Sequence, residues 1–284
     1  MALDQQHSEE KEMSFLDHLE ELRWHIVRSV AAIMVFMILA FVFAPWIFDN
    51  IVFAPANANF PTFRALCRLA EYVDNPALCV TDIPFKIQSR YVTGQFSMQF
   101  AAAFVIGLII AFPYVFWEIW RFIKPGLYNT EKKSSRGAVI AVTFLFLLGI
   151  SFGYYVLCPM SMWFFATYSI STVIVNEFDI TSYVQTIIAL VFGSGVLFQL
   201  PVVIFFLTRI GIVTPKFLRT YRKHAIIIIL ILAAIITPPD PLSQTIIAVP
   251  LYLLYEISIL ISGMEVRRKL KVEALEAREG SSNS

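Results

Sequence analysis

The chain has 284 residues, of which 58% are hydrophobic and 15% charged, and its formal net charge is +1. A soluble globular protein carries about 25% charged residues, so this composition excludes an ordinary soluble domain. The mean hydropathy of +0.70 instead predicts an all-α, polytopic membrane protein. No nucleic-acid partner is expected.

Residues 1–28 predict a cytoplasmic amphipathic segment. They do not resemble a cleaved signal peptide, because they are acidic and the apolar run after them is too long for the core of a signal. Ser14 and Asp17 have the spacing of a helix-starting capping box. One apolar stripe then follows at helical spacing, consisting of Phe15, Leu19, Leu22 and Ile26.

Residues 29–262 predict a membrane domain of six helices. Its runs, nearly free of charge, are about Ser29–Phe48, Ser97–Trp117, Ala138–Met160, Tyr183–Leu207, Ala225–Thr237 and Thr245–Ser262. The first four are long enough to span a bilayer, since ~20 helical residues cross a ~30 Å hydrocarbon core. The last two runs predict short helices, joined by a proline-rich turn at unusual depth. Residues 263–284 are expected to form a cytoplasmic polar tail.

The distribution of positive charge predicts the topology. Of the 22 lysines and arginines, all but four lie in residues 1–28, in the connections after the second and fourth runs, or in the tail. The positive-inside rule then places both termini in the cytoplasm. The exceptions lie in a long outer loop at about 49–96, and they are Arg64, Arg68, Lys86 and Arg90.

The outer loop contains two of the three cysteines. Cys67 and Cys79 could form a disulfide in an oxidising compartment, whereas Cys158 is expected to be packed and unpaired. Residues 61–75 have the apolar spacing of an amphipathic helix. This helix could lie on the outer membrane surface, or it could pack over the outer ends of the spans.

The candidate functional residues are carboxylates and amides. No metal-ligand spacing, nucleophile motif or phosphate-binding loop is present, so no enzyme activity, cofactor or metal site is predicted. We interpret the four histidines as lying near the cytoplasmic edges of the membrane, isolated from other functional residues. They are His7, His18, His25 and His224.

Two of the polar residues fall within the spans. Glu256 is costly in the membrane, and it is read either as a functional group or as a neutral side chain bonded to a neighbouring helix. Gln199 could join two helices or face a polar cavity. In the short outer turn, Asp240 could simply initiate the turn.

Glu21 and Glu131 form the most informative pair, because both carboxylates stand at membrane ends among basic loops. A guanidinium pairs bidentately with a carboxylate, so two carboxylates on one face could capture two arginines. The alternative for Glu131 is a surface ion pair with a nearby lysine, which would be worth little. The sequence alone leaves open whether the two carboxylates share a face.

Several ordered blocks resemble the TatC family, the multispanning subunit of the twin-arginine protein translocase. They are His18–Arg23, Pro113 with Trp120–Tyr128 and Glu131–Lys133, Phe198–Pro201, Gly211–Thr214, Thr237–Asp240 with Ser243–Gln244, and Ala248–Pro250 with Tyr255–Ile257. Together they cover about residues 18–262. Any single block would be weak, but their order and spacing make the resemblance specific.

The resemblance implies a signal-peptide receptor and core translocase subunit in the bacterial inner membrane. It would export folded proteins using the proton-motive force, with single-span TatA and TatB subunits as partners and with further copies of itself. Glu21 and Glu131 would bind the arginine pair. Arg23, Phe122, Pro125 and Tyr128 would shape that site, and Asp240 and Gln244 match polar positions of the outer hairpin.

The sequence departs from the family pattern at three places. Gln199 stands where relatives often have glutamate, His25 replaces a basic residue, and the first outer loop is longer than usual. The alternative functions are a proton-coupled secondary transporter of a small solute, with Glu256 as relay, and a scaffold subunit. The absence of an inverted repeat weakens the transporter hypothesis.

Overall fold

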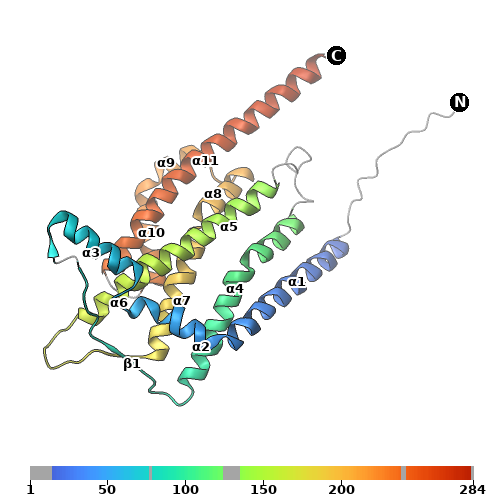
Figure 1. Cartoon of the computed structure of the whole chain (residues 1–284). Coiled ribbons are helices and arrows are strands. Elements are labelled where there is room, and N and C mark those ends of the chain that lie inside the picture. The colour runs from blue at the N-terminus through green and yellow to red at the C-terminus, as the bar shows by residue number, and fades with distance from the viewer. Residues whose placement is uncertain (1–14, 77–78, 124–134, 238–240, 283–284) are drawn as a thin grey trace.

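The computed structural model describes residues 15–76, 79–123, 135–237 and 241–282, and this part of the chain is a helical bundle (Figure 1). Within these described residues, five helical segments are long and apolar enough to cross a membrane, and they are Glu20–Val42, Gly94–Phe122, Val139–Thr167, Ile180–Arg209 and Pro241–Lys271. The prediction of an all-α polytopic protein is confirmed at this level. The capping residue Ser14 lies outside the described residues.

The first two spans are single helices, α1 (Phe15–Val42) and α4 (Gly94–Ile123). They lie side by side in opposite directions (Figure 1). Gly107 of α4 makes their approach possible, since a Cβ there would lie 2.6 Å from the backbone nitrogen of Met37 in α1. Small residues allow membrane helices to pack backbone to backbone in this way.

The third and fourth spans are interrupted at prolines, which cannot donate a helical hydrogen bond. The third consists of α5 (Ser135–Phe152), the π-helical turn η6 (Gly153–Leu157) and α6 (Cys158–Thr167), which has Pro159 in its first turn. The fourth consists of α7 (Ile180–Leu197) and α8 (Leu200–Arg209), divided just before Pro201.

Helix α7 is the centre of the bundle. Half of the most apolar window of its span is buried, against 17% to 33% in the other four spans. Its Ser194 hydroxyl donates to the carbonyl oxygen of Gly149 in α5 at 2.8 Å. The outward faces of the remaining spans are apolar and exposed, as expected for surfaces that contact lipid.

The last two helices differ greatly in length. α10 (Arg222–Ile236) has 15 residues and is about 22 Å long, so it is shorter than a ~30 Å hydrocarbon core. In contrast, α11 (Pro241–Ser282) has 42 residues, and the prediction of a short last helix is wrong. Its apolar run is short, but the polar residues that follow are good helix formers and continue the same helix.

Smaller elements gather at the end of the bundle where α1 ends and α4 begins, which we call the distal end. They are α2 (Ala44–Ile47), the π-helical turn η1 (Phe48–Val52), the 3₁₀ turn η2 (Ala54–Ala56), α3 (Pro61–Val73), β1 (Lys86–Gln88) and β2 (Glu177–Asp179). β1 and β2 pair in parallel, with Lys86 opposite Glu177. This pairing ties the long first loop to the connection that enters α7.

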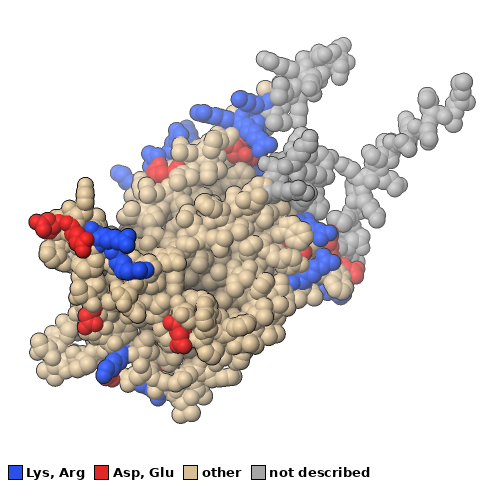
Figure 2. Space-filling view, in the orientation of Figure 1, with Lys and Arg blue, Asp and Glu red and all other residues tan. Residues whose placement is uncertain are grey.

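The opposite end, where α1 begins and α4 ends, is called the proximal end. The short helix α9 (Pro215–Thr220) lies between α8 and α10 (Figure 1). On the face shown in Figure 2, charged groups gather toward the two ends of the bundle and leave an uncharged band between them. Such a band is what a membrane-spanning surface requires.

Candidate functional site

The proximal ends of α1 and α4 hold a pair of buried ionisable residues. His25 of α1 is 6% exposed and Glu118 of α4 is 1% exposed. His25 Nδ1 is hydrogen-bonded to Glu118 Oε2, and the Tyr114 hydroxyl also hydrogen-bonds the Glu118 carboxylate. A buried carboxylate is costly unless it is paired and hydrogen-bonded, so these contacts explain how Glu118 is tolerated between two helices.

His25 also connects Glu118 to Glu21. The Nε2 atom of His25 lies 3.9 Å from Oε1 of Glu21, one helical turn earlier in α1. Unlike Glu118, Glu21 is partly open to solvent, with 40% of its side chain exposed. The imidazole therefore stands between one buried carboxylate and one accessible carboxylate.

A cavity of about 370 Å³ opens beside this histidine. It is lined by Glu21, Trp24, His25, Arg28 and Arg121. A cationic ligand that entered here would be attracted by the Glu21 carboxylate and repelled by Arg28 and Arg121, which also line the cavity. The geometry therefore allows recognition of one guanidinium or ammonium group at the surface of the bundle.

The structure places three of the six predicted signal-peptide residues. Glu21 lines the cavity, and the Phe122 ring meets the His25 ring edge to face at a centroid distance of 6.1 Å. Arg23 is exposed and does not line the cavity, but its guanidinium lies 5.6 Å from the ring of Trp24, which does. Pro125, Tyr128 and Glu131 lie outside the described residues, so a shared face for Glu21 and Glu131 stays a prediction.

Glu118 is the site residue that sequence reasoning missed, and the interpretation of His25 as isolated was wrong. Glu118 follows directly after an apolar run and resembles an ordinary surface carboxylate at its end. A signal was nevertheless present, because helical spacing puts it on the same stripe as Gly107, Ala111 and Tyr114. Ala111 is fully buried, which marks this stripe as the face packed on α1.

Glu256 of α11 is paired with a cation. Its Oε2 lies 2.7 Å from an Arg222 guanidinium nitrogen at the start of α10, and its Oε1 accepts a 3.1 Å hydrogen bond from the Tyr252 hydroxyl. The neighbouring Tyr255 hydroxyl donates to the Leu218 carbonyl of α9. Glu256 therefore lies at the proximal level of the bundle and is bonded to the neighbouring helix α10 through Arg222.

The two amides predicted at depth join helices. Gln199, between α7 and α8, donates from Nε2 to the Val142 carbonyl of α5 at 3.3 Å. Its Oε1 is buried without a hydrogen-bond partner among the described residues. Gln244 of α11 donates to the Leu230 carbonyl of α10 at 3.2 Å, and Asp240 lies outside the described residues.

Comparison with known proteins gives a consistent result over most of the chain. The sequence model of the family described as Sec-independent protein translocase protein (TatC) matches residues 17–250. The Sec-independent protein translocase protein TatC of Blattabacterium sp. subsp. Periplaneta americana is 40% identical over 264 residues, which cover 92% of this chain and 99% of that protein. TatCy of Bacillus subtilis is 36% identical over 263 residues, covering 93% and 94%.

A solved structure is also similar. The crystal structure of a twin arginine translocase receptor, TatC, superposes with a TM-score of 0.65 at 27% sequence identity, covering 88% of this chain and 99% of that one. The likeness thus extends over the bundle and not only over short motifs.

Proposed function

This chain belongs to the TatC family of Sec-independent protein translocase subunits, and from that premise we propose that it is the receptor for twin-arginine signal peptides. It is a multi-pass membrane protein of a bacterial Tat system and not an enzyme. In this proposal it forms the core of a translocase that exports folded proteins using the proton-motive force.

The observation that carries the proposal is the accessible carboxylate of Glu21, which lines the proximal cavity. A partly exposed carboxylate can exchange water for a guanidinium at small desolvation cost, whereas the buried Glu118 is already engaged by His25. A planar guanidinium can form two parallel hydrogen bonds with a carboxylate, and an ammonium cannot. Glu21 would therefore receive one arginine of the signal.

The second arginine is assigned to Glu131, and the wall of the site to Phe122, Pro125 and Tyr128. Phe122 supports this assignment, because its ring packs against the imidazole that lies beside Glu21. Arg23 would act at the rim, where its exposed guanidinium lies over Trp24. In that position it could contact an acidic group or a main-chain carbonyl of the peptide.

For the topology, we propose six spans with both termini in the cytoplasm of a bacterium. The proximal end then faces the cytoplasm and α10 is the short fifth span. The α10–α11 hairpin, with Asp240 and Gln244, and the half-satisfied amide of Gln199 are proposed as contacts for single-span TatA and TatB subunits. Further copies of this chain would join the receptor complex, and no cofactor is assigned.

The test is binding of a labelled twin-arginine signal peptide to the purified full-length protein in detergent. A twin-lysine peptide should bind at least about tenfold more weakly, because lysine cannot pair bidentately. E21A and E131A should each lose the preference for arginine. E20A is the matched control, since Glu20 is the exposed neighbour of Glu21 and does not line the cavity.

Equal binding of the two peptides, or equal loss in E20A and E21A, would reject the carboxylate site. The transporter alternative makes a different prediction, namely proton flux that depends on a small solute in liposomes containing this protein alone. The engagement of Glu256 by Arg222 makes that glutamate a poor free relay.

A further inference from the structure

Helix α3 of the long first loop packs against the distal end of the third span. Its buried residue Phe63 is fully enclosed in a cluster with Phe60, Ile83 and Ala166. The Thr62 hydroxyl donates to the Tyr155 carbonyl, and the Phe60 ring stacks on the Tyr155 ring at 5.8 Å. Of the two interpretations of this helix, packing over the ends of the spans describes its buried face.

The same contacts place α3 at the level of the distal lipid headgroups. The third span runs from Val139 to Thr167, and about 20 helical residues cross a hydrocarbon core of ~30 Å, so a core that begins at Val139 would end near Cys158. The residues that α3 contacts on this span begin at Tyr155 and continue beyond Cys158 to Ala166. Helix α3 therefore lies at the boundary between hydrocarbon and headgroups.

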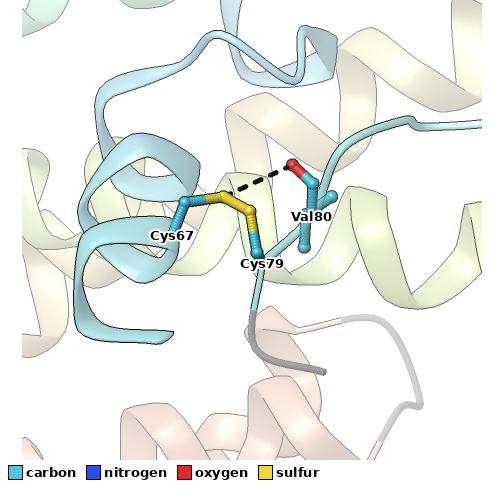
Figure 3. The surroundings of a disulfide bond; sticks show 3 residues. All are labelled: Cys67, Cys79 and Val80. Atoms are coloured by element: carbon cyan, nitrogen blue, oxygen red, sulfur yellow. Dashed lines mark hydrogen bonds between the residues drawn. A yellow bond between two sulfur atoms is a disulfide. The ribbon is translucent and has the colours of Figure 1, made fainter. Parts of the chain in front are cut away.

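A cavity of about 360 Å³ lies between α3 and the extended segment that follows its turn. It is lined by Ala58, Asn59, Arg64, Cys67, Arg68, Val80 and Thr81. Cys67 is one of the lining residues, and the Cys67–Cys79 disulfide ties the extended segment to α3 (Figure 3). A covalent bond therefore links the two segments that line the cavity.

The cavity is basic. Arg64 and Arg68 are one helical turn apart, so their side chains neighbour each other on the helix surface. Both are exposed, and neither has an ion-pair partner within the described ranges. The acidic residues closest in sequence, Glu71, Asp74 and Asp82, do not line the cavity. In Figure 2 the blue groups beside α3 lie between the acidic tip of this region and the body of the bundle.

We propose that this cavity binds the phosphodiester headgroup of an anionic phospholipid in the distal leaflet. Two guanidinium forks match the geometry of phosphate oxygens, and the amide of Asn59 and the hydroxyl of Thr81 are further donors on the lining. The exposed side chains of α3 also include the apolar Leu69, Tyr72 and Val73, each at least 48% exposed, and the acidic Glu71. A helix that presents arginines beside exposed apolar side chains is typical of the membrane interface.

A membrane lipid is favoured over a soluble anion because basic and apolar groups lie together at the headgroup level. A soluble phosphate would use only the arginines and would leave Leu69, Tyr72 and Val73 in water. This inference concerns the end of the bundle opposite to the signal-peptide cavity. It does not depend on the receptor function.

The experiment measures how much phosphatidylglycerol stays bound to the full-length protein, by native mass spectrometry, after transfer from mixed phosphatidylglycerol and phosphatidylcholine vesicles into detergent. A basic residue near an anionic surface contributes roughly a fivefold gain in binding. The double variant R64Q/R68Q should therefore retain about 25-fold less phosphatidylglycerol than the wild type. K86Q/R90Q is the matched control, because it removes two charges from the same loop but none from the cavity lining.

The outcomes separate the possible sources of the anion. Retention unchanged in R64Q/R68Q, or an equal loss in K86Q/R90Q, would overturn the site, because binding would then be absent from the cavity or due to general charge. Displacement of the lipid by millimolar inorganic phosphate would show a soluble-anion site and would also overturn the proposal. C67S/C79S, which releases one wall, should weaken selection of phosphatidylglycerol, and full retention there would contradict a built cavity.

Discussion

Replacing Glu118 with alanine should destabilise the bundle much more than replacing it with glutamine. Glu118 and His25 are 1% and 6% exposed, so neither side chain can exchange its partner for water. In E118A the imidazole and the Tyr114 hydroxyl both lose their acceptor, and leaving a buried polar group without its partner costs about 1–3 kcal/mol, more if the group is charged. In E118Q the amide oxygen still accepts from His25, and we expect a loss of about 1–2 kcal/mol.

The assay is unfolding of the purified protein in detergent micelles, followed by circular dichroism, for E118A, E118Q, H25A and the double variant E118A/H25A. Because the two residues are in contact, the double-mutant cycle should give a coupling free energy of about 1–3 kcal/mol. E71A is the control, since Glu71 is exposed on α3, and its effect should stay within about 0.5 kcal/mol.

Equal losses in E118A and E118Q would refute this reasoning, as would additivity of E118A and H25A to within about 0.5 kcal/mol. Signal-peptide binding provides a second readout. Without Glu118, the remaining carboxylate beside His25 is that of Glu21. His25 would then compete with the incoming arginine for Glu21. E118A should therefore weaken twin-arginine binding even where the protein is fully folded.

Three further predictions concern packing, pH and the second ion pair. G153A should destabilise the protein by about 1–3 kcal/mol, because the new Cβ would lie 2.2 Å from Ser194 Oγ. In the same unfolding assay G137A should be neutral or slightly stabilising, since nothing lies within 4 Å of its Cβ. The pKa of Asp179 is held below its usual 3.8, chiefly by the backbone N–H of Arg90. The stability that ionised Asp179 contributes is therefore complete above pH 3.8 and is lost as the pH falls through the lower folded pKa. Hydrogen exchange of residues 86–90 should rise in acid, and D179N should remove that rise. E256Q should lower the stability by less than about 1 kcal/mol, since the ion pair of Glu256 with Arg222 is partly exposed and such pairs contribute little. Protein export that survives in E256Q would argue against a proton relay at Glu256.

Sequence was sufficient for features that depend on local composition. Apolar runs longer than a bilayer is thick can form only spanning helices, because the backbone must satisfy its hydrogen bonds internally. The short α10 could be predicted because charge ends its run at Arg222 and Lys223 and prolines follow it. The ordered blocks spread over about residues 18–262 were together sufficient to identify the family.

Only the tertiary structure decided which distant polar groups meet. Glu118 and His25 are 93 residues apart in the chain, and Glu256 and Arg222 are 34 apart, so no local pattern could pair them. The length of α11 was missed for a related reason, since hydropathy marks where a helix leaves the membrane and does not mark where it ends. Periodicity indicates which face of a helix is buried, but the partner on that face depends on how the helices pack.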